Sequence, residues 1–303
     1  MMYSDMNQRK RPVSASAVAR IIIWSVVFCI FTGLFAVSLA DDFFQLDWAG
    51  IPSFVSTVIR YDDDDYSVGN GKSEAAVTAL SVEWVAGSVT VVPAEGNEVT
   101  VTEDYNGEDE KMRLRWKIED GVLSVKFCKP TRFGRNDMAK KSLTVAIPAA
   151  MLEAMGTVDI VGVDCDITFK GNADELSLEA VKGALTVEGD IGTLDVEAVD
   201  GHVIFRGGVR DADVECVNAN VTMHLDMAAE LDFDQVNGDV QLYLSEAVTG
   251  FTVERDSLGG GVVTEGFDGV DRTRDTVRWG NQSLRIRIDA VNAQLKIEKA
   301  TKD

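Results

Sequence analysis

The fold is decided by the stretch Leu176-Ser-Leu-Glu-Ala-Val-Lys-Gly-Ala-Leu-Thr-Val187, which recurs 18 residues later as Leu194-Asp-Val-Glu-Ala-Val-Asp-Gly-His-Val-Ile-Phe205. Further copies begin at residues 158, 212 and 231, so consecutive copies start 18 or 19 residues apart. Outlying copies begin at Leu80 and Ile286, and a partial one begins at Phe251. A fixed period near 20 residues is typical of an array of stacked repeats.

Each copy has apolar residues at its positions 1, 3, 6, 10 and 12. Positions 1 and 3, and again 10 and 12, alternate with polar residues, which predicts half-buried strands. Position 6 is expected to form a buried column, made of Val163, Val181, Val199, Val217 and Val236. Position 8 is small and suits a tight corner between two strands; it holds Gly183, Gly201 and Gly238 in three copies.

The predicted fold class is all-β, a parallel β-solenoid in which each copy is one coil stacked about 4.8 Å from the last. Crossover chirality favours right-handed winding. Residues 93–157 are expected to form β-hairpins, with one turn at Glu119-Asp-Gly121. The Gly- and Asp-rich residues 255–283 are expected to form a long loop.

One transmembrane helix is predicted over residues 21–40, an uncharged and mostly apolar run. Basic residues precede it and acidic residues follow it, so the N-terminus is expected in the cytoplasm. The alternative is a cleaved signal peptide ending at Ala40. The expected organisation of a single-pass cell-membrane protein is a cytoplasmic tail (1–20), the helix (21–40), a stalk or linker (41–74) and an extracellular repeat domain (75–300).

The formal net charge of −21 argues against nucleic acid as a partner, because binding it depends on Lys and Arg at the phosphates. Two histidines and the absence of known catalytic motifs favour a protein that is not an enzyme and has no cofactor. Cys165 and Cys216 lie three coils apart, too far for a disulfide. The exported cysteines are therefore expected to be free, packed thiols.

A carboxylate wall is predicted on the outward positions 2 and 4, where charges would stack at coil spacing. Its candidate cation-binding residues are Glu197, Glu215, Asp213, Asp232 and Asp234. Carboxylate oxygens suit Ca²⁺ and Mg²⁺, and the same face would attract a cationic peptide. The alternative is that the wall only keeps the protein soluble and prevents sheet aggregation.

A basic patch is predicted on a loop before the main array. Its candidate partner-binding residues are Lys129, Arg132, Arg135, Lys140 and Lys141. The patch is expected to dock anionic lipid headgroups or wall polymers, or to pair with the acidic body of this or another copy of the chain.

The copies of the form V-x-G-x-V-x-V, the N-terminal apolar segment and the closing Val291-Asn-Ala-Gln-Leu-Lys-Ile297 carry a family resemblance. Over about residues 75–300 the chain resembles the bacterial β-strand-repeat domain labelled "putative adhesin", which includes Lia-type envelope-stress proteins. The resemblance implies surface exposure and a role in adhesion or in the response to antimicrobial peptides. It carries over no catalytic residues.

Three functions remain open. The first is a membrane-anchored surface protein that binds or senses cations, cationic peptides or surface polymers and signals through another membrane protein. The second is a carbohydrate-active β-helix enzyme, which needs a paired acid and base or Ca²⁺ in a cleft. The third is a structural spacer or assembly module.

Overall fold

The computed structural model describes residues 58–132 and 139–300, whose regular structure is mostly β-strand. The first strands are β1 (Val58–Ile59), β2 (Ser67–Val68), β3 (Gly71–Ser73), β4 (Ala79–Ala94), β5 (Val99–Glu103), β6 (Arg115–Glu119), β7 (Val122–Lys126), β8 (Thr131–Arg132), β9 (Lys141–Pro148) and β10 (Thr157–Lys170). The later strands are β11 (Ala173–Glu188), β12 (Ile191–Met227), β13 (Glu230–Asn237), β14 (Val240–Leu244), β15 (Gly250–Gly259), β16 (Val262–Glu265), β17 (Asp271–Arg272), β18 (Thr276–Gly280), β19 (Leu284–Asn292) and β20 (Leu295–Lys299). A 3₁₀ turn (Glu110–Met112) and the short helix α2 (Ala149–Leu152) complete the elements. Strands β1 and β8 pair with each other, and the other 18 strands belong to one sheet.

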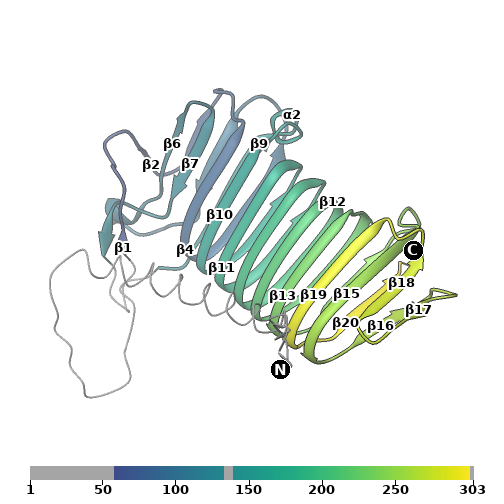
Figure 1. Cartoon of the computed structure of the whole chain (residues 1–303). Coiled ribbons are helices and arrows are strands. Elements are labelled where there is room, and N and C mark those ends of the chain that lie inside the picture. The colour runs from purple at the N-terminus through teal and green to yellow at the C-terminus, as the bar shows by residue number, and fades with distance from the viewer. Residues whose placement is uncertain (1–57, 133–138, 301–303) are drawn as a thin grey trace, which may run out of the picture.

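The copies of the repeat lie side by side as parallel strands in a single row (Figure 1). Val158 of β10 pairs with Leu176 of β11, and Leu176 pairs with Leu194 of β12. The outlying copy in β4 joins the same row, because its Leu80 pairs with Val158. The 18-residue period of the sequence is therefore the pairing register of the sheet.

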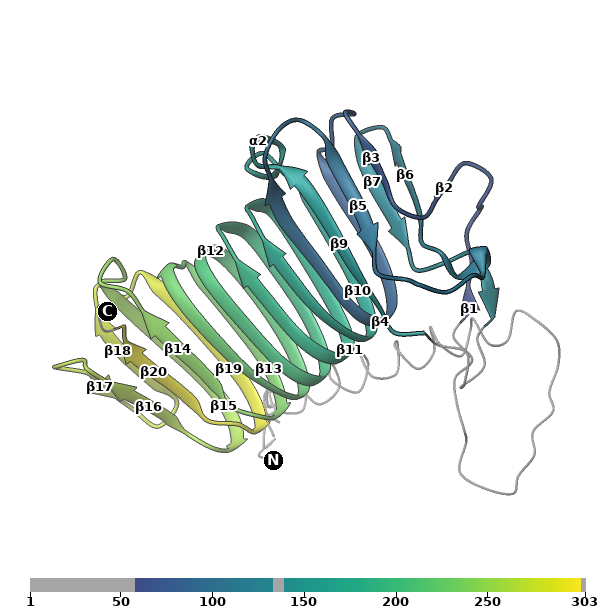
Figure 2. The same cartoon turned by 180° about the vertical axis from the view of Figure 1, so that it is seen from behind.

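Each copy has two arms that face one interior, which Figure 2 shows from behind. In the copy that begins at Val158, positions 1 and 3 are buried, and so are positions 8, 10 and 12. The buried positions change from odd to even because positions 6 and 7 both point outward where the chain turns. Both arms consequently bury their apolar side chains in a single core.

The valine column at position 6 lies outside this core, contrary to the prediction. Val181 is 39% exposed, and Val163, Val199 and Val217 are half-buried. Position 5 is buried instead. The alternation of the first strand simply continues through positions 1, 3 and 5, so position 6 shares the outer face with positions 2 and 4.

At the C-terminal end the spatial order of the strands departs from the chain order. Strand β19 lies between β13 and β15, since Leu231 pairs with Ile286, which pairs in turn with Val253. On the other arm β20 lies between β14 and β16. The predicted long loop over 255–283 is wrong, because these residues include β16, β17 and β18.

The N-terminal part closes the row with antiparallel strands. Strands β7 and β9 pair in parallel with the two arms of β4. Strand β6 then folds back and pairs antiparallel with β7. The turn between β6 and β7 lies at the expected Glu-Asp-Gly, where Asp120 and Gly121 both have positive φ. The described end of the predicted linker, residues 58–74, contributes β1, β2 and β3 to the fold.

The predicted fold class and location need correction. The predicted parallel β-solenoid with an N-terminal hairpin region is wrong: apart from β1 and β8, the strands form one large open sheet that contains antiparallel pairs at its C-terminal end as well as its N-terminal end. Over residues 58–132 and 139–300 no helix has the length and apolar character needed to span a bilayer. The transmembrane helix predicted over 21–40 lies outside the described residues, so the single-pass membrane location and cytoplasmic N-terminus have no support.

The three cysteines in the described part of the chain are free and buried, as predicted. Burial raises the pKa of the thiols of Cys128, Cys165 and Cys216 to about 12. These thiols are therefore inert packing groups at neutral pH.

Candidate functional site

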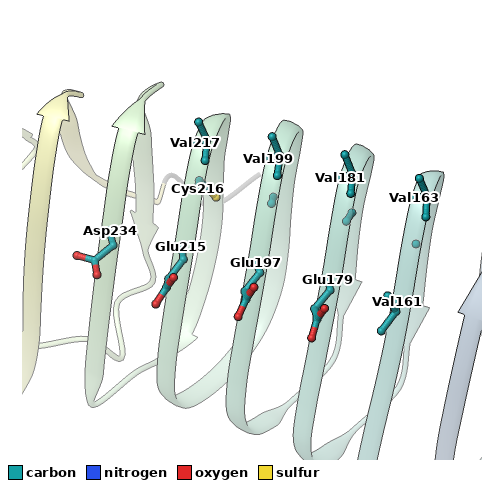
Figure 3. Close-up of a pocket in the computed structure, with 13 residues that line it drawn as sticks. Val161, Val163, Glu179, Val181, Glu197, Val199, Glu215, Cys216, Val217 and Asp234 are labelled. Atoms are coloured by element: carbon teal, nitrogen blue, oxygen red, sulfur yellow. The ribbon is translucent and has the colours of Figure 1, made fainter. Parts of the chain in front are cut away.

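A groove crosses the strands on the outer face of the first arm (Figure 3). One side is an acidic column, which consists of Glu179, Glu197, Glu215 and Asp234. The other side is lined by four members of the valine column: Val163, Val181, Val199 and Val217. The groove has a volume of about 210 Å³, and its floor between the columns is formed by the backbone at position 5, as at Ala180 and Ala198.

Strand alternation and register together build the two columns. Positions 4 and 6 of a copy point to the same face because side chains alternate along a strand. Glu179 pairs with Glu197, and Glu215 pairs with Asp234, so like residues lie on neighbouring strands about 4.8 Å apart. The repeat thereby produces a row of carboxylates beside a row of valines.

The acidic column is electrostatically strained. Burial and the neighbouring carboxylates raise the pKa of Glu215 to about 7. The same two causes raise the pKa of Asp234 to about 6, with Asp289 the strongest charged neighbour. Burial, followed by like charge, also raises the pKa values of Glu179 and Glu197. Within the part of the chain that the structure describes, no carboxylate of the column forms an ion pair.

The two predicted wall residues at position 2 lie outside the groove. Asp213 pairs in register with Asp232, and Asp232 forms an ion pair with Arg287 at 3.1 Å. Burial raises the pKa of Asp213, and the charge of Asp195 adds to it. The predicted wall is therefore two separate columns. The position-4 carboxylates line the groove, whereas the position-2 carboxylates lie outside it and end in the ion pair of Asp232 with Arg287.

Among residues 58–132 and 139–300, no three His, Cys, Asp or Glu side chains converge in a way that would hold a metal ion. The carboxylates of the acidic column are spread along a line rather than gathered around a point (Figure 3). Such a line is suited to several cations spaced along the groove.

The described lysines of the predicted basic patch each have an acidic partner within the chain. Lys129 lies 3.5 Å from Asp63, and Lys140 pairs with Asp164 at 2.9 Å. Arg132 is the last residue of β8, and Arg135 lies outside the described residues.

Lys141 is wrong as a surface contact, since it is buried with only 1% of its area exposed. Its Nζ donates to Glu103 at 2.7 Å and to the carbonyl oxygens of Met112 and Phe127. The same nitrogen lies 4.9 Å from the centre of the Trp84 ring. Alternation gave the signal, because Leu143, Val145 and Ile147 also face the core.

Two parts of the groove were not predicted as site residues. The valine column was assigned to the core on hydrophobicity alone. Asp289 was not connected with the wall, yet it pairs in register with Asp234 and extends the acidic column by one strand. The order of β13, β19 and β15 places it there, and no local sequence signal reports that order.

Comparison with known proteins gives only remote structural similarity. No protein-family model matches the chain, and no curated protein matches it in sequence. A "putative cell adhesion protein" from Clostridium sporogenes is similar with a TM-score of 0.38 and 12% identity, over 77% of this chain and 100% of that chain. A "putative adhesin" from Bacteroides fragilis gives 0.38 and 12%, over 76% and 97% of the two chains. Another "putative adhesin", from Parabacteroides merdae, gives 0.41 and 11%, over 78% and 98%.

Proposed function

We propose that this chain is an adhesin-like binding protein whose groove takes cationic, partly apolar segments of a protein or peptide partner. The observation that carries the proposal is the acidic column running beside the partly exposed valine column. One column attracts positive charge, and the other gives apolar surface that is stabilised when a ligand covers it. The proposed role is binding rather than catalysis.

The opposite arm of the repeat supports this role by contrast. At position 13 the side chains of neighbouring copies differ in charge: Lys170 pairs with Glu188 at 2.9 Å. Further along, His224 stacks on Tyr243 with ring centres 4.5 Å apart. The repeat therefore folds with mixed or neutral columns. Stacking of the copies therefore does not require a column of uniform negative charge. Repulsion between the carboxylates of such a column destabilises the unliganded protein.

A cationic ligand would remove that repulsion. Carboxylates whose pKa values are raised by burial and by like charge gain more from an approaching cation than isolated surface carboxylates do. Lys and Arg side chains of a protein or peptide ligand hold their charges at a spacing fixed by the ligand backbone. A line of carboxylates is suited to charges that are spaced regularly in this way. The Lia-type envelope-stress role implied by the sequence resemblance stays a prediction, because it depends on a further signalling partner.

The experiment measures binding of a fluorescein-labelled peptide of Lys and Leu to the full chain by fluorescence anisotropy. We expect the triple variant E197Q/E215Q/D234N to bind at least tenfold more weakly than the parent chain. The matched control is E74Q/E95Q/E153Q, which removes the same charge at exposed positions away from the groove. Equal losses in both variants would reduce the effect to net charge and contradict the proposal, as would unchanged binding in the first variant.

A further inference from the structure

We infer that the groove takes its cationic ligand as an amphipathic α-helix lying across the strands, parallel to the acidic and valine columns. The inference rests on the proposed function and adds the conformation and direction of the ligand. It follows from three features of the groove: the hydrogen bonding of its floor, the spacing of its columns and their side-by-side placement.

The floor of the groove offers a ligand no free sheet edge. Strand β11 pairs with β10 on one side and with β12 on the other, so the backbone under Glu179 and Val181 is already hydrogen-bonded. A peptide cannot add here as a further strand, because strand addition needs an unpaired edge. An extended ligand would leave its own backbone groups unpaired in a half-buried groove, whereas an α-helix pairs them internally.

The spacing of the columns also matches a helix better than an extended chain. Four carboxylates on consecutive strands span about 14 Å, three steps of about 4.8 Å. Three turns of an α-helix cover about 16 Å. The difference of about 2 Å over the whole column is within the reach of flexible lysine side chains.

An extended peptide returns to the same face only every second residue, or about 6.7 Å. Three such steps cover about 20 Å, which exceeds the acidic column by more than one strand spacing. Charges of an extended ligand would therefore fall out of step with Glu179, Glu197, Glu215 and Asp234. Four cations on successive helix turns stay in step.

The two columns present the complement of an amphipathic surface. Positions 4 and 6 are two residues apart on a strand, so a carboxylate and a valine of the groove lie about 6.6 Å apart in each of the three copies that begin at residues 176, 194 and 212. A helix with an apolar stripe beside a basic stripe places each against its matching column. The acidic column needs about 10 residues of helix at 1.5 Å per residue, and Asp289 extends the match by about one turn.

The test compares two 14-residue peptides of identical Lys and Leu composition with the full chain. In one peptide Leu recurs at the 3.6-residue helical period, and in the other Leu and Lys alternate strictly. We expect the peptide with the helical pattern to bind at least tenfold more tightly than the alternating peptide. On binding, the ellipticity at 222 nm should become more negative than the sum of the separate spectra. A central proline in the same peptide should abolish that change and lower affinity at least tenfold.

Two valine variants test the apolar side. V181S/V199S should weaken binding of the helical-pattern peptide at least fivefold, whereas V68S/V122S, which changes exposed valines elsewhere, should leave it within twofold. Equal or tighter binding of the alternating peptide, no gain at 222 nm, or no effect of V181S/V199S would overturn the helix while leaving an acidic binding groove in place. If neither peptide responds to E197Q/E215Q/D234N, the proposed function itself fails.

Discussion

Nζ of Lys141 lies 2.7 Å from Oε2 of Glu103, and both side chains are closed to solvent. Glu103 also accepts from the backbone N–H of Leu114 at 2.8 Å. The pair thus joins β9 and β5 to the segment before β6, at the end of the row where the parallel copies meet antiparallel strands.

Lys141→Met should lower the free energy of unfolding by about 3–5 kcal/mol, because it leaves the Glu103 carboxylate buried without its cation. Urea unfolding measures the change. Lys140→Met is the matched control, since Lys140 is 70% exposed, and it should stay within about 0.5 kcal/mol. Adding Glu103→Gln to Lys141→Met should recover part of the loss; a single variant as stable as the parent chain would contradict the account.

Glu215→Gln should stabilise the protein at high pH and have little effect at low pH. The pKa of Glu215 is raised from 4.5 to about 7, so the folded state binds more protons than the unfolded state between these values. Its contribution to stability is therefore lost as pH rises from about 4.5 to 7.

At pH 8 the substitution should add roughly 1 kcal/mol, after allowance for solvent screening, and at pH 4.5 close to nothing. Thermal unfolding at the two pH values measures this difference in stability, with the exposed Glu74→Gln as control. A gain of the same size at both pH values would contradict it.

Affinity for the Lys and Leu peptide should fall as pH decreases from 8 to 5.5, because Glu215 and Asp234 take up protons near pH 7 and pH 6. Stability and affinity therefore change in opposite directions over this range. Anisotropy titrations in one buffer series measure the slope. The slope should flatten in E197Q/E215Q/D234N, and an unaltered slope in that variant would assign the pH dependence to other groups.

Gly201→Ala should lower the free energy of unfolding by roughly 3 kcal/mol. Gly201 has a φ of +155°, and a Cβ there would lie 1.9 Å from the carbonyl oxygen of Gly183 on the neighbouring copy. Gly261→Ala is the control, since nothing lies within 4 Å of a Cβ at that site. Chemical denaturation should show a clearly lower free energy of unfolding for Gly201→Ala than for Gly261→Ala. Equal stabilities of the two variants would contradict the close approach of Gly201 to the Gly183 carbonyl.

Arg272→Ala should increase self-association of the chain. Among the described strands, the register of β16 is with β20, and Arg272 donates to the Val262 carbonyl at 2.9 Å and to the Thr264 hydroxyl. This side chain covers part of an otherwise open strand edge, which is a known route to aggregation. Sedimentation velocity at several concentrations measures the effect, with Arg274→Ala, 93% exposed, as control. Identical sedimentation of both variants would show that Arg272 does not protect the edge.

The register of the sheet could be predicted from the sequence, because an 18-residue period allows one superposition of Val158, Leu176 and Leu194. The facing of Val181 could not be read from its hydrophobicity. Alternation from Leu176 places position 5 inside and position 6 outside, but Ala180 is a weaker apolar signal than Val181. The more hydrophobic side chain, Val181, suggested that position 6 faces the core. The strand alternation instead continues up to the corner at positions 6 and 7, so position 6 faces outward.

Three of the five predicted cation-binding residues lie in the groove. Glu197, Glu215 and Asp234 were found because position 4 repeats, and the structure brings them to one groove. Alternation with Leu143 and Val145 indicates a buried position for Lys141, but the partner that compensates its charge, Glu103, lies 38 residues away in sequence and could not be identified from the local pattern. Asp289 depends on a strand order that skips a segment of chain, which periodicity does not encode.

Since the copies that begin at residues 176, 194, 212 and 231 each bring one carboxylate and one valine to the same face, the proposed binding surface grows in equal increments. Loss or duplication of a single unit, such as residues 194–211, would shorten or lengthen the contact by one step without altering its cross-section. Recombination between such similar segments would therefore change the length of the proposed contact by unit number instead of by point substitution.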